Sequence, residues 1–185
     1  MCIRDSNSSF NCNAAKVLVL PSGWAQKDQF VQKVRETLAF TPARKAYYPG
    51  AQDRYQAFLS QYPDAIPLTE DGEEVVPWTV LPDVDLKKGE YALSNEAFCG
   101  VLAEVEIEAN TASEFIGKVG AVCNEDIWGT LSCMVLIDSK TEKENKEAFE
   151  DLLAELRYGG IAVNCWAGVI FGLASTSWGA YPGHT

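Results

Sequence analysis

The sequence has very little histidine, with only His184 among 185 residues, and no CxxC pair. Its six cysteines are scattered at positions 2, 12, 99, 123, 133 and 165. A structural zinc site needs four closely spaced Cys or His ligands, so we expect no metal site, and free thiols in a reducing compartment fit this pattern. Cys123, Cys133 and Cys165 stand among apolar neighbours and are predicted to be core residues.

Long apolar runs and basic clusters are missing as well. No run approaches the roughly 18 apolar residues of a membrane span, and no signal-peptide core follows the first residue. The net charge is -11 and the longest basic cluster is Lys87-Lys88, which argues against a nucleic-acid partner. We therefore expect a cytoplasmic protein with no nucleic-acid or membrane partner.

The composition present is that of a soluble globular domain, with 47% apolar and 22% charged residues. Hydrophobic periodicity predicts strands at 16–21, 74–81, 102–107, 129–138 and 161–165. It predicts helices at 25–39, 50–59, 111–122 and 140–158. This alternation indicates an α/β domain with a largely parallel sheet flanked by helices.

Both ends of the chain are unusual. Residues 1–6, Met-Cys-Ile-Arg-Asp-Ser, resemble the translation of the transposon end used to build sequencing libraries, and we predict that they are an adaptor scar. The last residues, 178–185, are turn-like and include Pro182 and Gly183. We therefore expect residues 7–185 to be a partial domain, truncated at both ends.

Cys12 is the candidate nucleophile, because it stands in a short polar turn just before the apolar run 17–20. A nucleophilic cysteine needs access to substrate and a lowered thiol pKa, which backbone N–H groups and Lys16, one turn away, can supply. A half-buried cysteine in a connecting turn is the other interpretation. From the residues alone, that structural interpretation is the more frequent outcome.

The segment 9–16, Ser-Phe-Asn-Cys-Asn-Ala-Ala-Lys, resembles the active-site cysteine motif of the aldehyde dehydrogenase superfamily. The Gly-Gln pair that the family has before its cysteine is Ser9-Phe10 here. A second block resembles the family's cofactor motif, in which a Glu and a Phe lie against the nicotinamide ribose and ring. Glu96 and Phe98 match these positions, and Cys99-Gly100 stands in place of the family's Gly-Pro.

A third, weaker block lies near the end of the chain. Residues 159–164, Gly-Gly-Ile-Ala-Val-Asn, resemble the family's strand beside the substrate tunnel. Side chains just after that strand line the tunnel in the family, so Trp166 and Phe171 are the candidates here. Aromatic residues after a core strand are more often packing residues, and this alternative stays open.

The resemblance implies the catalytic domain of an NAD- or NADP-dependent aldehyde dehydrogenase. Cys12 would attack an aldehyde to form a thiohemiacetal and then a thioester, which is hydrolysed to the carboxylic acid. The general base Glu, the oxyanion Asn and most of the dinucleotide domain would lie upstream, so this fragment alone is expected to be inactive. The full-length protein would be a homo-oligomer.

Two other functions remain open from the sequence. The altered residues Ser9-Phe10 and Cys99-Gly100 also suit a CoA-acylating aldehyde dehydrogenase or acyl-CoA reductase of the same superfamily. A non-catalytic binding or scaffold domain, in which Cys12 is structural, is the alternative from another class.

Overall fold

The computed structural model describes residues 7–46, 48–70, 72 and 74–183, so the predicted adaptor residues 1–6 lie outside the described part. The helices are η1 (Asn7–Ser9, 3-10), α1 (Lys27–Ala39), α2 (Ala51–Gln61), α3 (Tyr91–Ser94), α4 (Ala112–Glu125), α5 (Ser139–Glu144), α6 (Lys146–Glu155) and α7 (Gly168–Leu173). The strands are β1 (Val17–Pro21), β2 (Ile66–Pro67), β3 (Thr79–Leu81), β4 (Val101–Ile107), β5 (Ser132–Val135) and β6 (Gly160–Val163).

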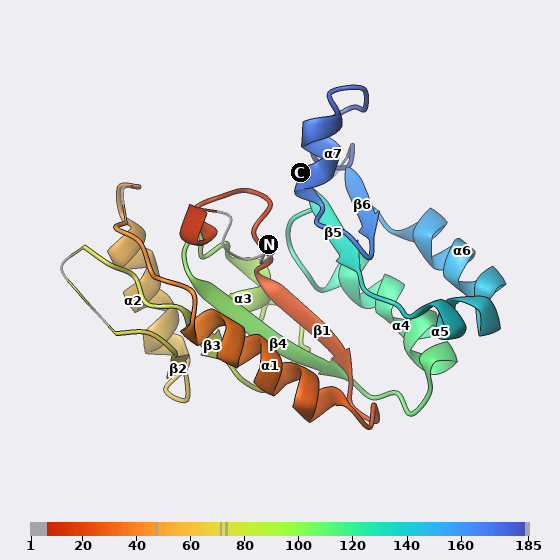
Figure 1. The fold of residues 1–185 in the computed structure, drawn as a ribbon, viewed down its shortest axis with the longest axis horizontal. Helices are drawn as coiled ribbons and strands as arrows, with labels where there is room; N and C mark the ends of the chain where they lie inside the picture. The colour runs from red at the N-terminus through yellow and green to blue at the C-terminus, as the bar shows by residue number, and fades with distance from the viewer. Residues whose placement is uncertain (1–6, 47, 71, 73, 184–185) are drawn as a thin grey trace.

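Two groups of strands form the framework (Figure 1). The first is a four-stranded sheet in the order β1-β4-β3-β2, in which β1, β4 and β3 are parallel and β2 is antiparallel. The second consists of β5 and β6, which are also parallel. The predicted α/β fold with a largely parallel sheet is therefore confirmed.

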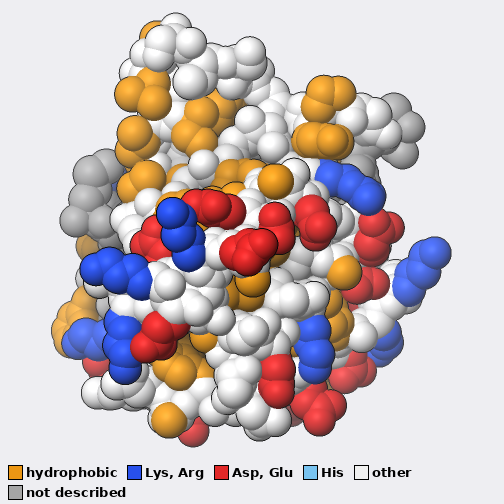
Figure 2. All heavy atoms as spheres, turned by 90° about the vertical axis from the view of Figure 1, so that its right-hand side faces the viewer, with side chains coloured by type: hydrophobic (Ala, Val, Ile, Leu, Met, Phe, Trp, Pro, Cys, Tyr) orange, Lys and Arg blue, Asp and Glu red, His pale blue; other side chains and the backbone are white. Residues whose placement is uncertain are grey.

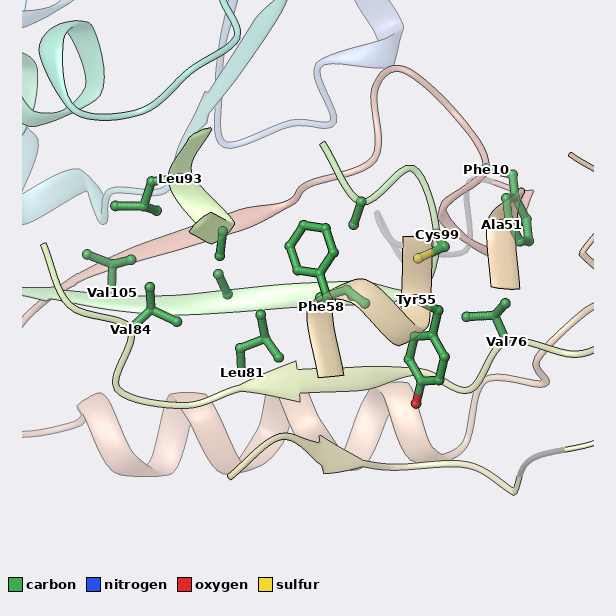
Figure 3. Close-up of a cluster of buried hydrophobic side chains, with 14 residues drawn as sticks. Phe10, Ala51, Tyr55, Phe58, Val76, Leu81, Val84, Leu93, Cys99 and Val105 are labelled. Carbon is green, nitrogen blue, oxygen red and sulfur yellow. The ribbon is translucent and has the colours of Figure 1, made fainter. Parts of the chain in front are cut away.

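Strand β4 is central to the first sheet, and its two faces meet different helices. Val101, Ala103 and Val105 pack with side chains of α2 and α3 in the largest buried cluster. Figure 3 shows this cluster, with Phe10 and Cys99 at one end and Val105 at the other. Leu102 faces the other way and packs against Leu38 and other residues of α1.

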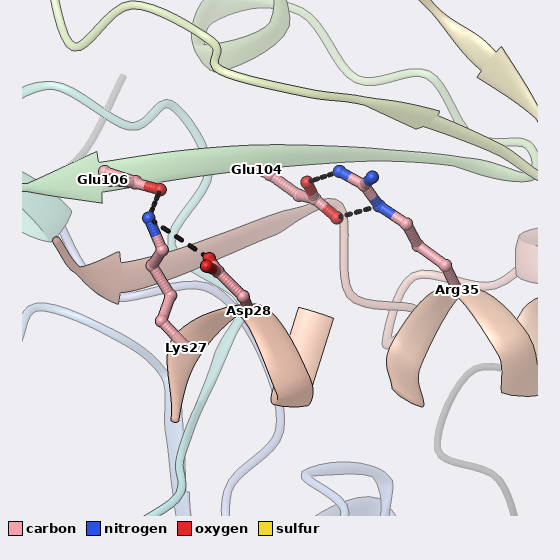
Figure 4. Close-up of polar contacts among 5 residues, drawn as sticks. All are labelled: Lys27, Asp28, Arg35, Glu104 and Glu106. Atoms are coloured by element: carbon pink, nitrogen blue, oxygen red, sulfur yellow. Dashed lines mark hydrogen bonds and ion pairs between the residues drawn. The ribbon is translucent and has the colours of Figure 1, made fainter. Parts of the chain in front are cut away.

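Charged residues also join α1 to β4, on the same face as Leu102. Arg35 donates two hydrogen bonds to the carboxylate of Glu104, one of them from Nε at 3.2 Å (Figure 4). Lys27 forms an ion pair with Glu106, which lies two residues after Glu104 on the same face of the strand. The Glu residues of this alternating strand are thus covered by a helix and paired.

The second strand pair has its own core, formed with α4 and α6. Ile116 and Cys123 of α4 pack against Phe149 and Leu152 of α6 in this cluster. Ile127, which follows α4, packs against both this cluster and the one beside β4. The two strand groups are therefore connected through shared apolar contacts.

Three expectations for individual elements were wrong. The predicted strand 74–81 is regular only over β3, because Pro77 lacks the N–H that a continuing ladder requires. The predicted helix 140–158 is two helices, which break at Asn145 (φ -123°, ψ 27°). Cys165, predicted to be a core residue, is exposed, whereas Cys123 is buried.

Regarding membranes, none of the helices in the described part of the chain combines the length and apolar character needed to cross a bilayer.

Candidate active site

Cys12 lies in a tight turn between η1 and β1. The Ala14 N–H donates to the Asn11 carbonyl at 3.1 Å, and the Asn13 N–H donates to the Asn11 side chain at 2.8 Å. Asn residues favour such turns because their side chains replace a backbone acceptor two residues on. The turn leaves the Cys12 thiol exposed to solvent, as a nucleophile requires.

The loop of the second motif lies at the same edge of the sheet as this turn. The Cys12 turn runs into the first residue of β1, and the loop with Glu96 and Phe98 runs into the first residue of β4. These strands are parallel neighbours, with Val17 paired to Ala103. Segments that precede adjacent parallel strands meet at one edge, so the fold brings the first two motifs together.

Lys16 contacts both segments. Its ammonium group donates to the Ser9 carbonyl at 2.8 Å and to the Ser9 hydroxyl at 2.7 Å, on the side of the Cys12 turn. It also donates to the Cys99 carbonyl at 3.4 Å and lies 5.8 Å from the centre of the Phe98 ring. The predicted motif residue Lys16 thus bridges the turn and the loop.

Three aromatic rings form a connected wall beside this bridge. Phe10 stacks on Tyr48, with 6.1 Å between ring centres, and Tyr48 meets Phe98 edge-on at 5.0 Å. Tyr48 also borders an open depression of about 670 Å³ beside α2. Its neighbour Tyr47 lies outside the described residues.

Helix α2 also contacts the second motif, through the side chain of Arg54. Arg54 donates from Nε to the Ala97 carbonyl at 3.2 Å and from Nη1 to the Pro49 carbonyl at 3.2 Å. Phe98 is half-buried, and Glu96 is exposed, so its carboxylate is accessible to a ligand. Sequence reasoning missed Arg54, because nothing in the helix pattern of α2 distinguishes it from other surface residues.

Positive-φ backbone occurs in all three motif segments. Four of the non-glycine residues described with positive φ are Ser8 (52°), Ser9 (66°), Phe98 (44°) and Asn164 (54°). Ser9, Phe98 and Asn164 belong to the first, second and third motifs, and Ser8 directly precedes the first. Such conformations are costly for L-residues and persist where the surroundings hold them, most often at functional sites.

The residues of the third motif are arranged differently. Asn164 accepts a hydrogen bond from the Ile137 N–H at 2.9 Å and donates to the Ile137 carbonyl at 2.8 Å, at the carboxyl end of β6. The Cys12 turn instead reaches the first residue of β5, where Ser132 donates to the Asn13 side chain at 3.1 Å. The hydrogen bonds of Asn164 and the Cys12 turn therefore lie at opposite ends of the β5–β6 pair.

The two tunnel candidates lie around α7. Trp166 is half-buried, and its ring covers Gly168 so closely that a Cβ there would approach within 2.4 Å. Phe171 is 65% exposed and contacts Trp178 edge-on at 5.5 Å. Hydrophobic side chains gather at the top of the face in Figure 2, at the height of α7 in Figure 1. The tunnel role of these two residues stays a prediction.

Burial separates the described thiols into two groups. It raises the pKa of Cys99 to about 11, of Cys123 to about 12 and of Cys133 to about 11, so these thiols stay protonated and inert at neutral pH. Cys12 and Cys165 are the exposed thiols in the described part of the chain. Cys12 is the one of these two that adjoins the second motif.

Burial lowers the pKa of Lys16 to about 8, against the smaller opposing effects of Cys99 and Glu96. Between about pH 8 and 10.5 the unfolded chain therefore binds more protons at this residue, and its contribution to stability rises with pH. We therefore expect the difference in unfolding free energy between the wild type and Lys16→Met to change by about 1–2 kcal/mol in favour of the wild type when the pH rises from 7 to 9.5. Urea titrations of both proteins at each pH would measure this, and a constant difference would contradict it.

Metal ligands do not gather at this site. In residues 7–46, 48–70, 72 and 74–183, no group of three or more His, Cys, Asp or Glu side chains is placed to hold a metal ion.

The chain is an α/β domain with a largely parallel sheet. An exposed cysteine and a loop with a positive φ, which is held by two cationic side chains, lie at one edge of this sheet. Solved structures of aldehyde dehydrogenases have this fold, and the fold resemblance predicted from the motifs is confirmed. A betaine aldehyde dehydrogenase from Staphylococcus aureus superposes with a TM-score of 0.72 at 14% identity, over 94% of this chain and 35% of its own.

Two further structures show the same likeness. Lactaldehyde dehydrogenase from Escherichia coli matches with a TM-score of 0.66 at 17% identity, over 88% of this chain and 34% of its own. An aldehyde dehydrogenase from Bacillus cereus in complex with NAD+ matches with a TM-score of 0.67 at 15% identity, over 88% and 33%. The chain thus spans about a third of the length of these proteins. No family model matches the sequence, and no curated protein matches it.

Proposed function

We propose that this chain is part of the catalytic domain of an NAD(P)-dependent aldehyde dehydrogenase, which oxidises an aldehyde to a carboxylic acid. One observation carries the proposal. An exposed cysteine and the Glu96–Phe98 loop, joined through Lys16, meet at one edge of the sheet in a chain with the aldehyde dehydrogenase fold. The geometry supplies a nucleophile beside a candidate cofactor loop.

In the proposed mechanism, Cys12 attacks the carbonyl carbon of the aldehyde as a thiolate. The Cys12 N–H and an Asn from polypeptide outside this chain stabilise the oxyanion. Loss of hydride from the adduct leaves a thioester on Cys12. Water, activated by a Glu that also lies outside this chain, then releases the carboxylic acid.

The residues of the second motif fit a nicotinamide cofactor. The exposed carboxylate of Glu96 can accept hydrogen bonds from ribose hydroxyls, and the half-buried Phe98 ring provides a flat apolar surface. Bound NAD(P)+ would supply the hydride acceptor. Lys16 and Arg54 hold the carbonyls on both sides of Phe98, which fixes the surface that the ring presents.

The chemistry of Cys12 can be tested on this chain alone with p-nitrophenyl acetate, which acylates reactive thiolates without a cofactor. We expect acetylation at Cys12 to exceed that at Cys165, the other exposed cysteine among the described residues, by at least about tenfold, because Cys12 lies in the proposed site and Cys165 does not. Peptide mass spectrometry after short exposures would locate and quantify the acetyl group.

Two variants make this test specific. Cys12→Ser should abolish the fast acetylation, and the matched Cys165→Ser should retain it. Equal, slow acetylation of Cys12 and Cys165 would overturn the catalytic assignment and favour the non-catalytic scaffold, in which Cys12 is structural.

The chain alone should lack dehydrogenase activity, because the general base and the dinucleotide domain of the proposed enzyme lie outside it. We expect no aldehyde-dependent increase in NAD(P)H absorbance from the purified chain. Measurable turnover would contradict the proposed division of the active site. Homo-oligomer formation is likewise proposed for the whole enzyme.

A CoA-acylating enzyme is the second candidate, favoured by the altered residues of the first motif. Phe10 takes the place of the family's Gln and is buried in the core rather than available to the substrate. The acetyl-Cys12 formed in the test above distinguishes the two functions. Faster loss of the acetyl group with coenzyme A than with an equal concentration of a simple thiol, such as 2-mercaptoethanol, would support a CoA-acylating enzyme, and equal rates would count against it.

A further inference from the structure

The Lys16 side chain donates hydrogen bonds to two segments that are distant from each other in the sequence. An ammonium group has three protons to donate, and the structure offers Lys16 three oxygen acceptors, two on Ser9 and one on Cys99. Ser9 lies seven residues from Lys16 in the sequence, whereas Cys99 lies 83 residues from it. The hydrogen-bonding capacity of this side chain is thus used entirely to connect the Cys12 turn with the Glu96–Phe98 loop.

Both connected segments are strained where Lys16 touches them. Ser9 has φ 66°, and Phe98, next to the acceptor Cys99, has φ 44°. The Lys16 ammonium also lies on the face of the Phe98 ring, at 5.8 Å from its centre, which is a favourable cation–π distance. Non-glycine residues keep such backbone conformations only where their surroundings hold them. Lys16 contacts both of these strained segments.

We propose that Lys16 is a positioning residue, which fixes the Phe98 loop relative to the Cys12 turn. The inference rests on the proposed function, in which the thiol and the Phe98 surface must be held at one distance for hydride to leave the Cys12 adduct. Arg54 secures the other side of the loop through the Ala97 carbonyl. Loss of Lys16 removes the polar contacts on the side of the loop that faces the Cys12 turn and leaves the ring contacts of Phe98 as the remaining support there.

Cysteines already present in the chain report on this arrangement. Cys99 is fully buried next to the Lys16 contact, whereas Cys123 and Cys133 belong to the separate cluster beside β5. In Lys16→Met, labelling of Cys99 by N-ethylmaleimide should rise at least about tenfold, while Cys123 and Cys133 keep their wild-type rates. Peptide mass spectrometry at pH 7 would measure all three rates in one sample.

Three further variants make the result interpretable. Lys16→Arg keeps the cation and should largely restore the protection of Cys99. Ser9→Ala removes one acceptor and should give a smaller increase than Lys16→Met. The matched control Lys118→Met removes an exposed lysine that donates to the Glu108 carbonyl, and it should leave Cys99 protected.

A positioning role and a purely structural role predict different patterns. If Lys16→Met opens Cys99, Cys123 and Cys133 alike, Ser9→Ala decides, and the same uniform opening there would overturn the proposal. Full protection of Cys99 in Lys16→Met would overturn it as well. The Cys99 measurement does not depend on Cys12 reactivity, so a failure of the acetylation test leaves this result separately readable.

Discussion

Arg35→Met is expected to lower the free energy of unfolding by about 3 kcal/mol, because it leaves the Glu104 carboxylate buried without its partner. The Glu104 side chain is only 8% exposed, and Arg35 is 26% exposed. Removal of one member of a buried pair typically costs about 3–5 kcal/mol, and the partial exposure of Arg35 places this pair at the lower end. Asp83, which also interacts with Arg35, would lose a favourable charge.

The double variant Arg35→Met/Glu104→Leu tests this reason directly. It removes both charges, so most of the lost stability should return. Lys33→Met is the matched control, because Lys33 pairs with Glu36 on the exposed side of the same helix and should change stability by less than about 0.5 kcal/mol. Urea unfolding followed by circular dichroism measures all three, and a double variant no more stable than Arg35→Met would refute the unpaired-charge explanation.

The general fold was predictable from the sequence because it depends on patterns that are local. Alternating apolar segments identified β1, α1, α2, β4 and α4 close to their observed bounds. The N-cap of α4 is an example, since Thr111 accepts from the Glu114 N–H at 3.2 Å, as the spacing of these two residues predicts. The position of two motifs before parallel strands then follows from the α/β alternation.

The contacts that join the site were not predictable in the same way. Lys16 reaches Cys99 across 83 residues, and Arg35 reaches Glu104 across 69. Hydrophobic periodicity specifies which face of β4 is covered by a helix, but not which cation of that helix will meet which carboxylate. The break between α5 and α6 at Asn145 was not predicted either, because polar residues continue through this position and the sequence pattern does not mark it.

Phe10 shows how a departure from a family motif can have a structural cause. The aldehyde dehydrogenase motif that this segment resembles has a Gln at this position. Here the side chain is 2% exposed and belongs to the main buried cluster, at the end that also contains Cys99 (Figure 3). Through Tyr48, its ring supports Phe98 in the second motif. The Phe10 ring is therefore an apolar anchor for the segment that leads into the Cys12 turn.

Phe10→Ala should accordingly cost about 3–5 kcal/mol of unfolding free energy, the usual loss when a buried Phe is truncated. Phe10→Gln, which restores the family's residue, should also be destabilising, because it buries an amide among apolar side chains. Phe40→Ala is the matched control, since Phe40 is 88% exposed, and its effect should stay within about 0.5 kcal/mol. Urea unfolding of the three variants compares them directly. A Phe10→Gln variant as stable as the wild type would show that the first motif tolerates the family's residue, and that burial of Phe10 does not anchor the Cys12 turn.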